Sequence, residues 1–209
     1  MSVTPDRDTE AAVQAAAPPT GIANPAPLGL AAFALTTFLL SAAVAHWTNG
    51  NATGESWLGY ALAYGGIVQL LAGMWEFRNR NVFGAVAFST YGAFWIGLWY
   101  WARFVSPAAP VSSAFALRDQ GWIFLAFLIF NTYMLILSAQ VNRAVFAVFL
   151  TLELTEFFGF IGLFASLGLL QFAGYVGILT AFVAWYASFA ILSNDMGGRI
   201  KLPVGKPLV

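Results

Sequence analysis

Six long apolar runs follow one another along the 209-residue chain, separated by short segments with polar or turn-forming residues. The runs extend over about Leu28 to Ala45, Trp57 to Trp75, Val82 to Phe104, Gly121 to Ser138, Ala144 to Leu169, and Phe172 to Leu192. Each is close to the roughly 20 apolar residues that an α-helix needs to cross a hydrocarbon core about 30 Å thick. The pattern therefore predicts an all-α integral membrane protein, a bundle of six transmembrane helices in a lipid bilayer.

Loops are predicted between these runs, at Trp47 to Ser56, Glu76 to Asn81, Val105 to Gln120, Ala139 to Arg143, and Leu170 with Gln171. The last connection is so short that the fifth and sixth runs are nearly continuous. A glycine is the residue that most readily interrupts such a pattern, so the turn between these two helices is expected at Gly168.

Composition strengthens the membrane assignment. The chain is 60% hydrophobic and only 9% charged, whereas soluble domains carry roughly 25% charged residues. It has no cysteine, which excludes disulfides and thiolate chemistry, and its formal net charge of zero argues against nucleic acid as a partner.

The Lys and Arg residues of the loops predict the orientation, because cationic loops resist translocation. If both termini lie on one side, that side holds seven basic residues: Arg7, Arg78, Arg80, Arg143, Arg199, Lys201 and Lys206. The other side holds Arg103 and Arg118. Both termini are therefore expected in the cytoplasm, with the six helices crossing the plasma (inner) membrane.

Residues 1–20 differ from the rest of the chain, being polar and alanine-rich with three acidic residues and a Pro-Pro pair. Such a segment has too little apolar surface to fold, so a disordered tail is expected. The predicted organisation is a cytoplasmic N-terminal tail (1–20), a six-helix transmembrane domain (21–194) and a cytoplasmic C-terminal tail (195–209).

No enzyme signature is present in the sequence. There is one histidine, His46, and there is no metal-ligand spacing, no phosphate-binding glycine loop and no serine-histidine-acid set. His46 falls where the first helix is expected to meet the outer interface, which favours a structural or solvated role. We therefore expect no catalytic residue, metal or cofactor.

The stretch Asn24-Pro25-Ala26-Pro27-Leu28-Gly29-Leu30 opens the first apolar run. Two prolines remove two backbone donors and disfavour helical conformation at the preceding residues, so no regular helix is expected before Pro27. Such backbone is tolerated at a membrane only where protein or water satisfies it. We interpret the stretch as lining a conduit, with the Asn24 amide and the helix-opening amides forming a carboxylate-binding patch. The alternative is a proline-rich helix start that is simply packed against neighbours.

Glu153 and Glu156 lie within the fifth apolar run, three residues apart and on one helix face. A carboxylate at mid-membrane costs about 2.5 to 3.5 kcal/mol, so each acid should be neutral, paired or facing water. Two interpretations compete. Glu156 is the better candidate for a proton site coupled to anion movement, and Glu153 for an acid bonded to partners at a subunit interface.

The sequence resembles the acetate uptake transporter family, the succinate-acetate permease group. The resemblance rests on the proline stretch through Phe33, on Tyr64-Gly65-Gly66-Ile67-Val68-Gln69, on Tyr91-Gly92 with Phe94-Trp95, and on Phe172-Ala173-Gly174. It implies six helices per subunit, a homohexameric ring with a conduit through each subunit, and passage of acetate, sometimes succinate or other short carboxylates.

The same resemblance implies a mid-membrane constriction formed by Phe33, Tyr91 and Leu152. Substrate contacts are expected from the proline stretch and from polar side chains near the constriction: Asn24, Pro25, Pro27, Leu30, Gln69, Ser89, Thr90 and Tyr91. Glu76 matches an acid of the family at the cytoplasmic end of the second helix. Read by itself, Glu76 could equally be a solvated helix end near Arg78 and Arg80.

The function expected from these observations is a transporter or channel for acetate and similar short carboxylates, with proton symport as an open question. The first alternative is a membrane sensor or scaffold that conducts nothing. The second is a channel for neutral small solutes, such as undissociated acid or ammonia, which an apolar constriction also admits.

Overall fold

The computed structural model describes residues 21–48, 56–108 and 113–209 of the chain, without the side chains of 108 and 113–117. The tail predicted over residues 1–20 lies outside this part. All regular elements of the described residues are helical. They are α2 (Ala26–Val44), α3 (Ser56–Leu62), η1 (Ala63–Val68), α4 (Gln69–Arg78), α5 (Val82–Tyr100), η2 (Trp101–Val105), α6 (Ser106–Ala108), α7 (Ser113–Ser138), α8 (Arg143–Ala165) and α9 (Leu167–Asp195).

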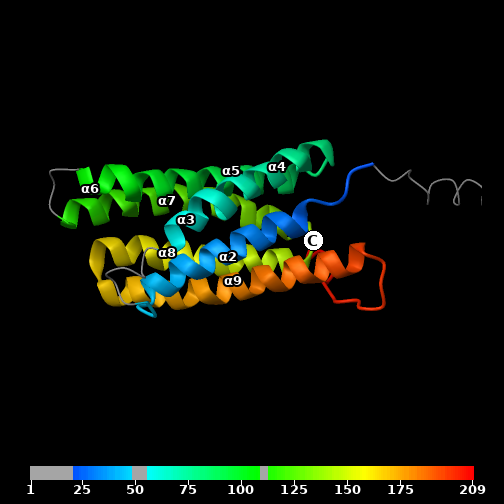
Figure 1. Cartoon of the computed structure of the whole chain (residues 1–209). Helices are drawn as coiled ribbons and strands as arrows, with labels where there is room; N and C mark the ends of the chain where they lie inside the picture. Colours follow the sequence, from blue (N-terminus) through cyan, green and yellow to red (C-terminus); the bar gives the residue numbers. More distant parts are fainter. Residues whose placement is uncertain (1–20, 49–55, 109–112) are drawn as a thin grey trace, which may run out of the picture.

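These elements form six helical segments that are long and apolar enough to cross a membrane. They cover Ala26–Val44, Ser56–Arg78, Val82–Val105, Arg118–Ser138, Arg143–Ala165 and Leu167–Asp195. The prediction of an all-α membrane protein with six transmembrane helices is confirmed. The helices run side by side, and both α2 and α8 lie along α9 (Figure 1).

Several boundaries differ from those predicted. α7 begins at Ser113, so part of the loop expected over 105–120 is helical. Hydropathy marks only the apolar part of a helix, whereas Arg118 and Asp119 continue this one as exposed residues. The turn between α8 and α9 lies at Ser166 rather than Gly168. The Ser166 backbone is extended, and its carbonyl accepts hydrogen bonds from the amides of Leu169 and Leu170.

The first helix begins one residue earlier than predicted, at Ala26. Amides of a first helical turn have no intrahelical acceptor, so Pro27 removes no bond there. The Asn24 side chain accepts the Ala26 amide at 3.0 Å, and the Pro25 carbonyl accepts that of Gly29 at 3.1 Å. The proline stretch therefore enters the helix directly.

One π-helical segment, η1, interrupts the second span, and another, η2, ends the third. In η1, Gly65 lies so close to Thr36 of α2 that a side chain at position 65 would clash with it. π-helical turns are uncommon and often occur at functional sites. Here the missing side chain of Gly65 lets the second span approach α2 closely.

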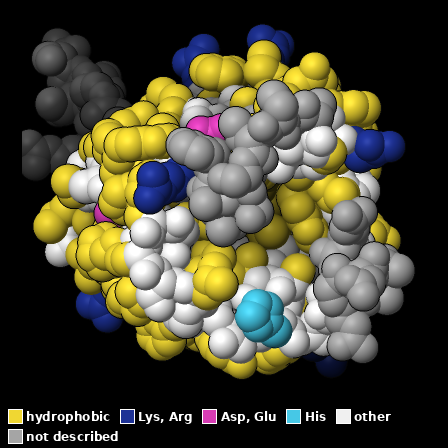
Figure 2. Space-filling model, turned by 90° about the vertical axis from the view of Figure 1, so that its left-hand side faces the viewer, with side chains coloured by type: hydrophobic (Ala, Val, Ile, Leu, Met, Phe, Trp, Pro, Cys, Tyr) yellow, Lys and Arg dark blue, Asp and Glu magenta, His cyan; other side chains and the backbone are white. Residues whose placement is uncertain are grey.

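The outside of the bundle is strongly apolar. Large side chains such as Ile129, Ile136, Leu179 and Phe182 are each more than half exposed. Figure 2 looks onto the end of the bundle that carries His46 and shows hydrophobic side chains over much of the visible surface. Such a surface suits contact with lipid acyl chains, and the chain is a multi-pass membrane protein.

The C-terminal segment folds back on the bundle after α9, at the same end as the start of α2 (Figure 1). The Ala144 amide donates to the Val204 carbonyl at 2.9 Å, and the Leu208 amide donates to the Ala139 carbonyl at 2.7 Å. This end of the bundle, which carries Asn24 and Asp195, is called the proximal end below. The opposite end, with His46, is called the distal end.

Candidate functional site

Three cavities lie in a row along the bundle. The proximal cavity has a volume of about 250 Å³ and the distal cavity about 100 Å³, and a central gap of about 20 Å³ lies between them. Leu30, Phe88 and Phe149 line both the proximal cavity and the central gap. The three cavities therefore follow one axis through the molecule.

The predicted constriction residues stand between the central gap and the distal cavity. Phe33 from α2, Tyr91 from α5 and Leu152 from α8 line both spaces, and all three are buried. The rings of Phe33 and Tyr91 meet edge to face with centroids 5.7 Å apart. A gap of about 20 Å³ holds about one water molecule, so the passage is closed to a carboxylate in this conformation.

A buried hydrogen-bond network surrounds the Tyr91 hydroxyl. It lies 3.0 Å from Oδ1 of Asn131 on α7 and 3.2 Å from Oε1 of Glu156 on α8. The Asn131 amide nitrogen donates to the Phe149 carbonyl at 3.0 Å and to Glu153 Oε2 at 2.6 Å. Three helices are thus joined at the level of the constriction.

The two glutamates of α8 have different surroundings. Glu156 is buried and lines the distal cavity. Glu153 is only partly buried, lies outside the walls of the three cavities, and is hydrogen-bonded to Asn131 and to the Thr132 hydroxyl of α7. These partners belong to the same subunit. Of the two candidate proton sites, only Glu156 faces the row of cavities.

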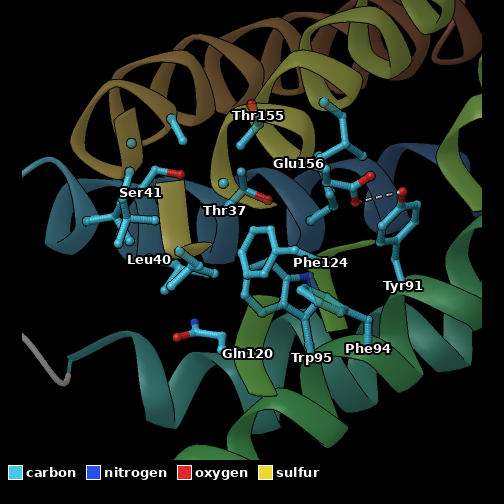
Figure 3. A pocket seen from close by; sticks show the side chains of 18 residues that line it. Thr37, Leu40, Ser41, Tyr91, Phe94, Trp95, Gln120, Phe124, Thr155 and Glu156 are labelled. Atoms are coloured by element: carbon cyan, nitrogen blue, oxygen red, sulfur yellow. Dashed lines mark hydrogen bonds between the residues drawn. The ribbon is translucent and has the colours of Figure 1, made fainter. Parts of the chain in front are cut away.

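Three residues that line the distal cavity carry buried polar atoms without hydrogen-bond partners in the described part of the chain. They are Thr37 Oγ1, Trp95 Nε1 and Glu156 Oε2. Figure 3 shows the Thr37, Trp95 and Glu156 side chains around Phe124, with the Tyr91–Glu156 contact as a dashed line. Because such atoms are rare in protein interiors, they call for a physical explanation.

These three polar residues follow a common spacing. Each lies four residues after a constriction residue, on a helix that runs from the proximal to the distal end: Phe33 and Thr37, Tyr91 and Trp95, Leu152 and Glu156. Four residues correspond to about one helical turn on the same face. The sequence reasoning did not identify Thr37, Trp95 or Asn131 as site residues. This i, i+4 spacing was the available signal for Thr37 and Trp95.

The proximal cavity lies at the N-termini of three helices. Asn24, Asn81 and Asn142 line it, and each accepts a backbone amide of α2, α5 or α8, at 3.0, 3.1 and 2.9 Å. The positive ends of three helix dipoles are therefore directed at this cavity. Among the described residues of its wall, none carries a formal charge.

Asn24 itself is exposed and already hydrogen-bonded. Its amide nitrogen donates to Asp195 Oδ2 at 2.8 Å, and its oxygen accepts the Ala26 amide. Pro25 and Pro27 are not among the residues that line the three cavities. Pro27 is buried, and its carbonyl accepts the Ser188 hydroxyl of α9 at 2.7 Å. Within the proline stretch, Asn24 and Leu30 thus line a cavity, whereas Pro27 packs against α9.

The remaining candidates are divided between the route and helix interfaces. Gln69 is buried and lines the central gap. Ser89 and Thr90 do not line the three cavities, and Ser89 faces Gly73 of α4.

Glu76 is fully buried and accepts the Asn79 amide at 3.1 Å, so its interpretation as a solvated helix end is wrong. His46 is exposed at the distal end.

In the described part of the chain, no group of three or more His, Cys, Asp or Glu residues could hold a metal ion. The described residues that line the three cavities offer hydroxyls, amides, one indole N–H and one carboxyl. Such groups can bind and release a small polar solute.

Comparison with known proteins identifies relatives of the chain. The profile of the GPR1/FUN34/yaaH family matches residues 8–206. Acetate permease A of Emericella nidulans is 35% identical over 207 residues, 87% of this chain and 65% of the permease. The chain thus spans slightly less than two thirds of that relative. The succinate-acetate/proton symporter SatP of Escherichia coli is 44% identical over 79 residues, 38% of this chain and 40% of the symporter.

The solved structure of the bacterial acetate channel SatP has the same fold. It aligns with a TM-score of 0.80 and 29% sequence identity, covering 88% of this chain and 99% of the channel. None of these three relatives is named as an enzyme, in agreement with the expectation from the sequence. The resemblance noted in the proline stretch is confirmed, and the chain belongs to the GPR1/FUN34/yaaH family.

Proposed function

We propose that this protein is a membrane transporter or channel for acetate and similar short carboxylates, including succinate. The single observation that carries the proposal is the row of three cavities, narrowed at Phe33, Tyr91 and Leu152. The named activities of acetate permease A and of SatP support this substrate class.

The proximal cavity is suited to receive a carboxylate from water. Three helix N-termini attract the anion without presenting a fixed cation. Binding to dipoles and amides is weaker than binding to a buried Arg or Lys, and a conducting path requires sites that release the solute readily.

The constriction selects by size and polarity. Its walls offer two aromatic rings, one aliphatic side chain and the Tyr91 hydroxyl, so a solute that passes must leave most of its water behind. A small acid with a methyl group loses little hydration on its apolar side. Passage requires these side chains to move apart, because the central gap is too small for acetate.

We further propose that the protein lies in the plasma membrane with both termini in the cytoplasm, and that it forms a homo-oligomer, expected to be a hexamer. The seven-to-two distribution of basic residues supports the orientation. The oligomer is inferred from the family resemblance. Cotransport of a proton is part of the same proposal, since a buried carboxyl, Glu156, lines the route.

The test is uptake of labelled acetate by proteoliposomes that contain the purified protein. Leu152→Trp should block protein-dependent uptake, because the larger ring fills the constriction. Leu154→Trp is the matched control, since Leu154 lies on the outer face of the same helix with 42% of its surface exposed. Equal uptake by both variants would contradict the proposed route. Failure of the unmodified protein to move any acid would favour the non-conducting sensor or scaffold.

A further inference from the structure

The distal cavity collects three buried polar atoms from three helices at one level. Thr37 Oγ1 on α2, Trp95 Nε1 on α5 and Glu156 Oε2 on α8 have no partner in the described part of the chain. The indole N–H is a donor only, and the threonine hydroxyl can donate. The cavity of about 100 Å³ that these residues line has room for a small solute. What the carboxyl offers depends on where its proton lies.

The orientation of Asn131 fixes the hydrogen bonds around this carboxyl. Its amide nitrogen lies 3.0 Å from the Phe149 carbonyl oxygen, which can only accept, so Oδ1 is the atom that faces Tyr91. Because Oδ1 is itself an acceptor, the single proton of the Tyr91 hydroxyl is donated to Asn131.

The hydroxyl has one proton for two oxygen neighbours, so both contacts are satisfied when Glu156 donates to Tyr91. The Glu156 Oε1 atom lies 3.2 Å from the hydroxyl oxygen, whose proton is already engaged with Asn131. A carboxyl protonated at Oε1 donates to that oxygen. Its Oε2 atom then faces the distal cavity as an acceptor without a donor.

We propose that the distal cavity binds the undissociated form of a short monocarboxylic acid, an inference that rests on the proposed function. The hydroxyl of the acid donates to Glu156 Oε2. Its carbonyl oxygen accepts from Trp95 Nε1–H and the Thr37 hydroxyl. Each of the three unpartnered atoms thereby gains a partner, whereas an acetate anion has no proton to offer Glu156 Oε2.

The charges around the cavity favour the same species. Among the described residues of its wall, Glu156 and Tyr91 are the titratable side chains, and α2, α7 and α9 contribute no charged group. Glu153, on the preceding turn of α8, faces α7 and is bonded to Asn131 and Thr132. None of the described residues of this wall is a cation that could compensate an anion, so the neutral acid is the form that fits.

Acetamide is a suitable probe, because it has a carbonyl acceptor and an N–H donor in the same arrangement and is uncharged at every relevant pH. In proteoliposomes, corrected for protein-free liposomes, acetamide should compete with labelled acetate. The half-saturating total acetate should rise about tenfold per pH unit above about pH 5, as the undissociated fraction falls. The inhibition constant of acetamide should stay constant.

Two variants test whether acetate and acetamide bind in the distal cavity. Glu156→Leu removes the acceptor and Thr37→Val removes a donor with little change of shape. Each should raise the half-saturating acetate and the acetamide inhibition constant about tenfold. The matched control is Thr151→Val, because the Thr151 hydroxyl of α8 bonds to the Ala147 carbonyl and lies outside the three cavities. It should leave both constants unchanged.

A protein that transports acetate with a half-saturating concentration independent of pH, and without inhibition by acetamide, would overturn this inference and leave the proposed function intact. Absence of protein-dependent acetate uptake at every pH would reject the proposed function itself.

Discussion

The hydroxyl of Tyr91 lies 3.2 Å from Oε1 of Glu156, so the narrowest point of the route is joined directly to the carboxyl of the cavity beyond it. The two residues come from α5 and α8 and are both buried. A change in the hydrogen bonding or protonation of Glu156 should therefore alter the position of Tyr91, a residue of the proposed constriction.

Tyr91→Phe should keep the packing of the constriction but remove its hydroxyl. Asn131 Oδ1 and Glu156 Oε1 then lose a partner, and the free energy of unfolding should fall by about 1 to 3 kcal/mol. Chemical unfolding of the detergent-solubilised protein measures this loss. Tyr133→Phe on α7 is the control, because the Tyr133 side chain is 48% exposed. Equal losses in both variants would argue against the network.

Leu152→Ala should widen the passage between the central gap and the distal cavity. Uptake of butyrate relative to acetate is expected to rise several-fold, and stability should fall by about 2 to 5 kcal/mol, as for other large-to-small core changes. The ratio of the two uptake rates in proteoliposomes is the measurement. Leu154→Ala on the exposed face is the control and should leave the ratio as in the unmodified protein. An equal rise in this control would contradict the assignment of Leu152 to the constriction.

Gly174→Ala should loosen the contact between α9 and α2. An added Cβ would lie 2.5 Å from the backbone nitrogen of Ala45 and 2.9 Å from the Ser41 carbonyl oxygen, so the helices must separate. The expected loss is about 1 to 3 kcal/mol. Gly97→Ala in α5, where a Cβ meets no atom within 4 Å, should instead be neutral or stabilising by up to about 1 kcal/mol. Melting temperatures in detergent distinguish the two cases.

The orientation can be tested with single cysteines, because the chain has none. Trp47→Cys and Arg199→Cys introduce thiols at exposed positions of opposite ends. In intact cells a membrane-impermeant maleimide should label position 47 only, and position 199 should become reactive after permeabilisation. The reverse pattern would place both termini outside.

Hydropathy and turn residues predicted the membrane class and all six spans. This was possible because a chain that crosses lipid must satisfy its backbone hydrogen bonds internally, which a continuous apolar helix does. The Phe33, Tyr91 and Leu152 set came from family resemblance and was not derivable from residue pattern. The predicted helix boundaries were wrong where polar residues continue a helix beyond the apolar run, as at Arg118 and Asp119 of α7. The turn after α8 was also misplaced, because the extended residue is Ser166 and not Gly168.

By itself, the sequence determined that six helices cross the bilayer and that two acids lie within the fifth. The tertiary structure decided that Glu156 faces a cavity while Glu153 faces α7. It also placed Thr37 and Trp95 in the wall of that cavity and Asn131 against the Tyr91 hydroxyl. The physical reason is that helices in lipid are apolar on both their outer and inner faces. Their residue pattern therefore does not reveal the inward face, which is set by packing between helices distant in the sequence.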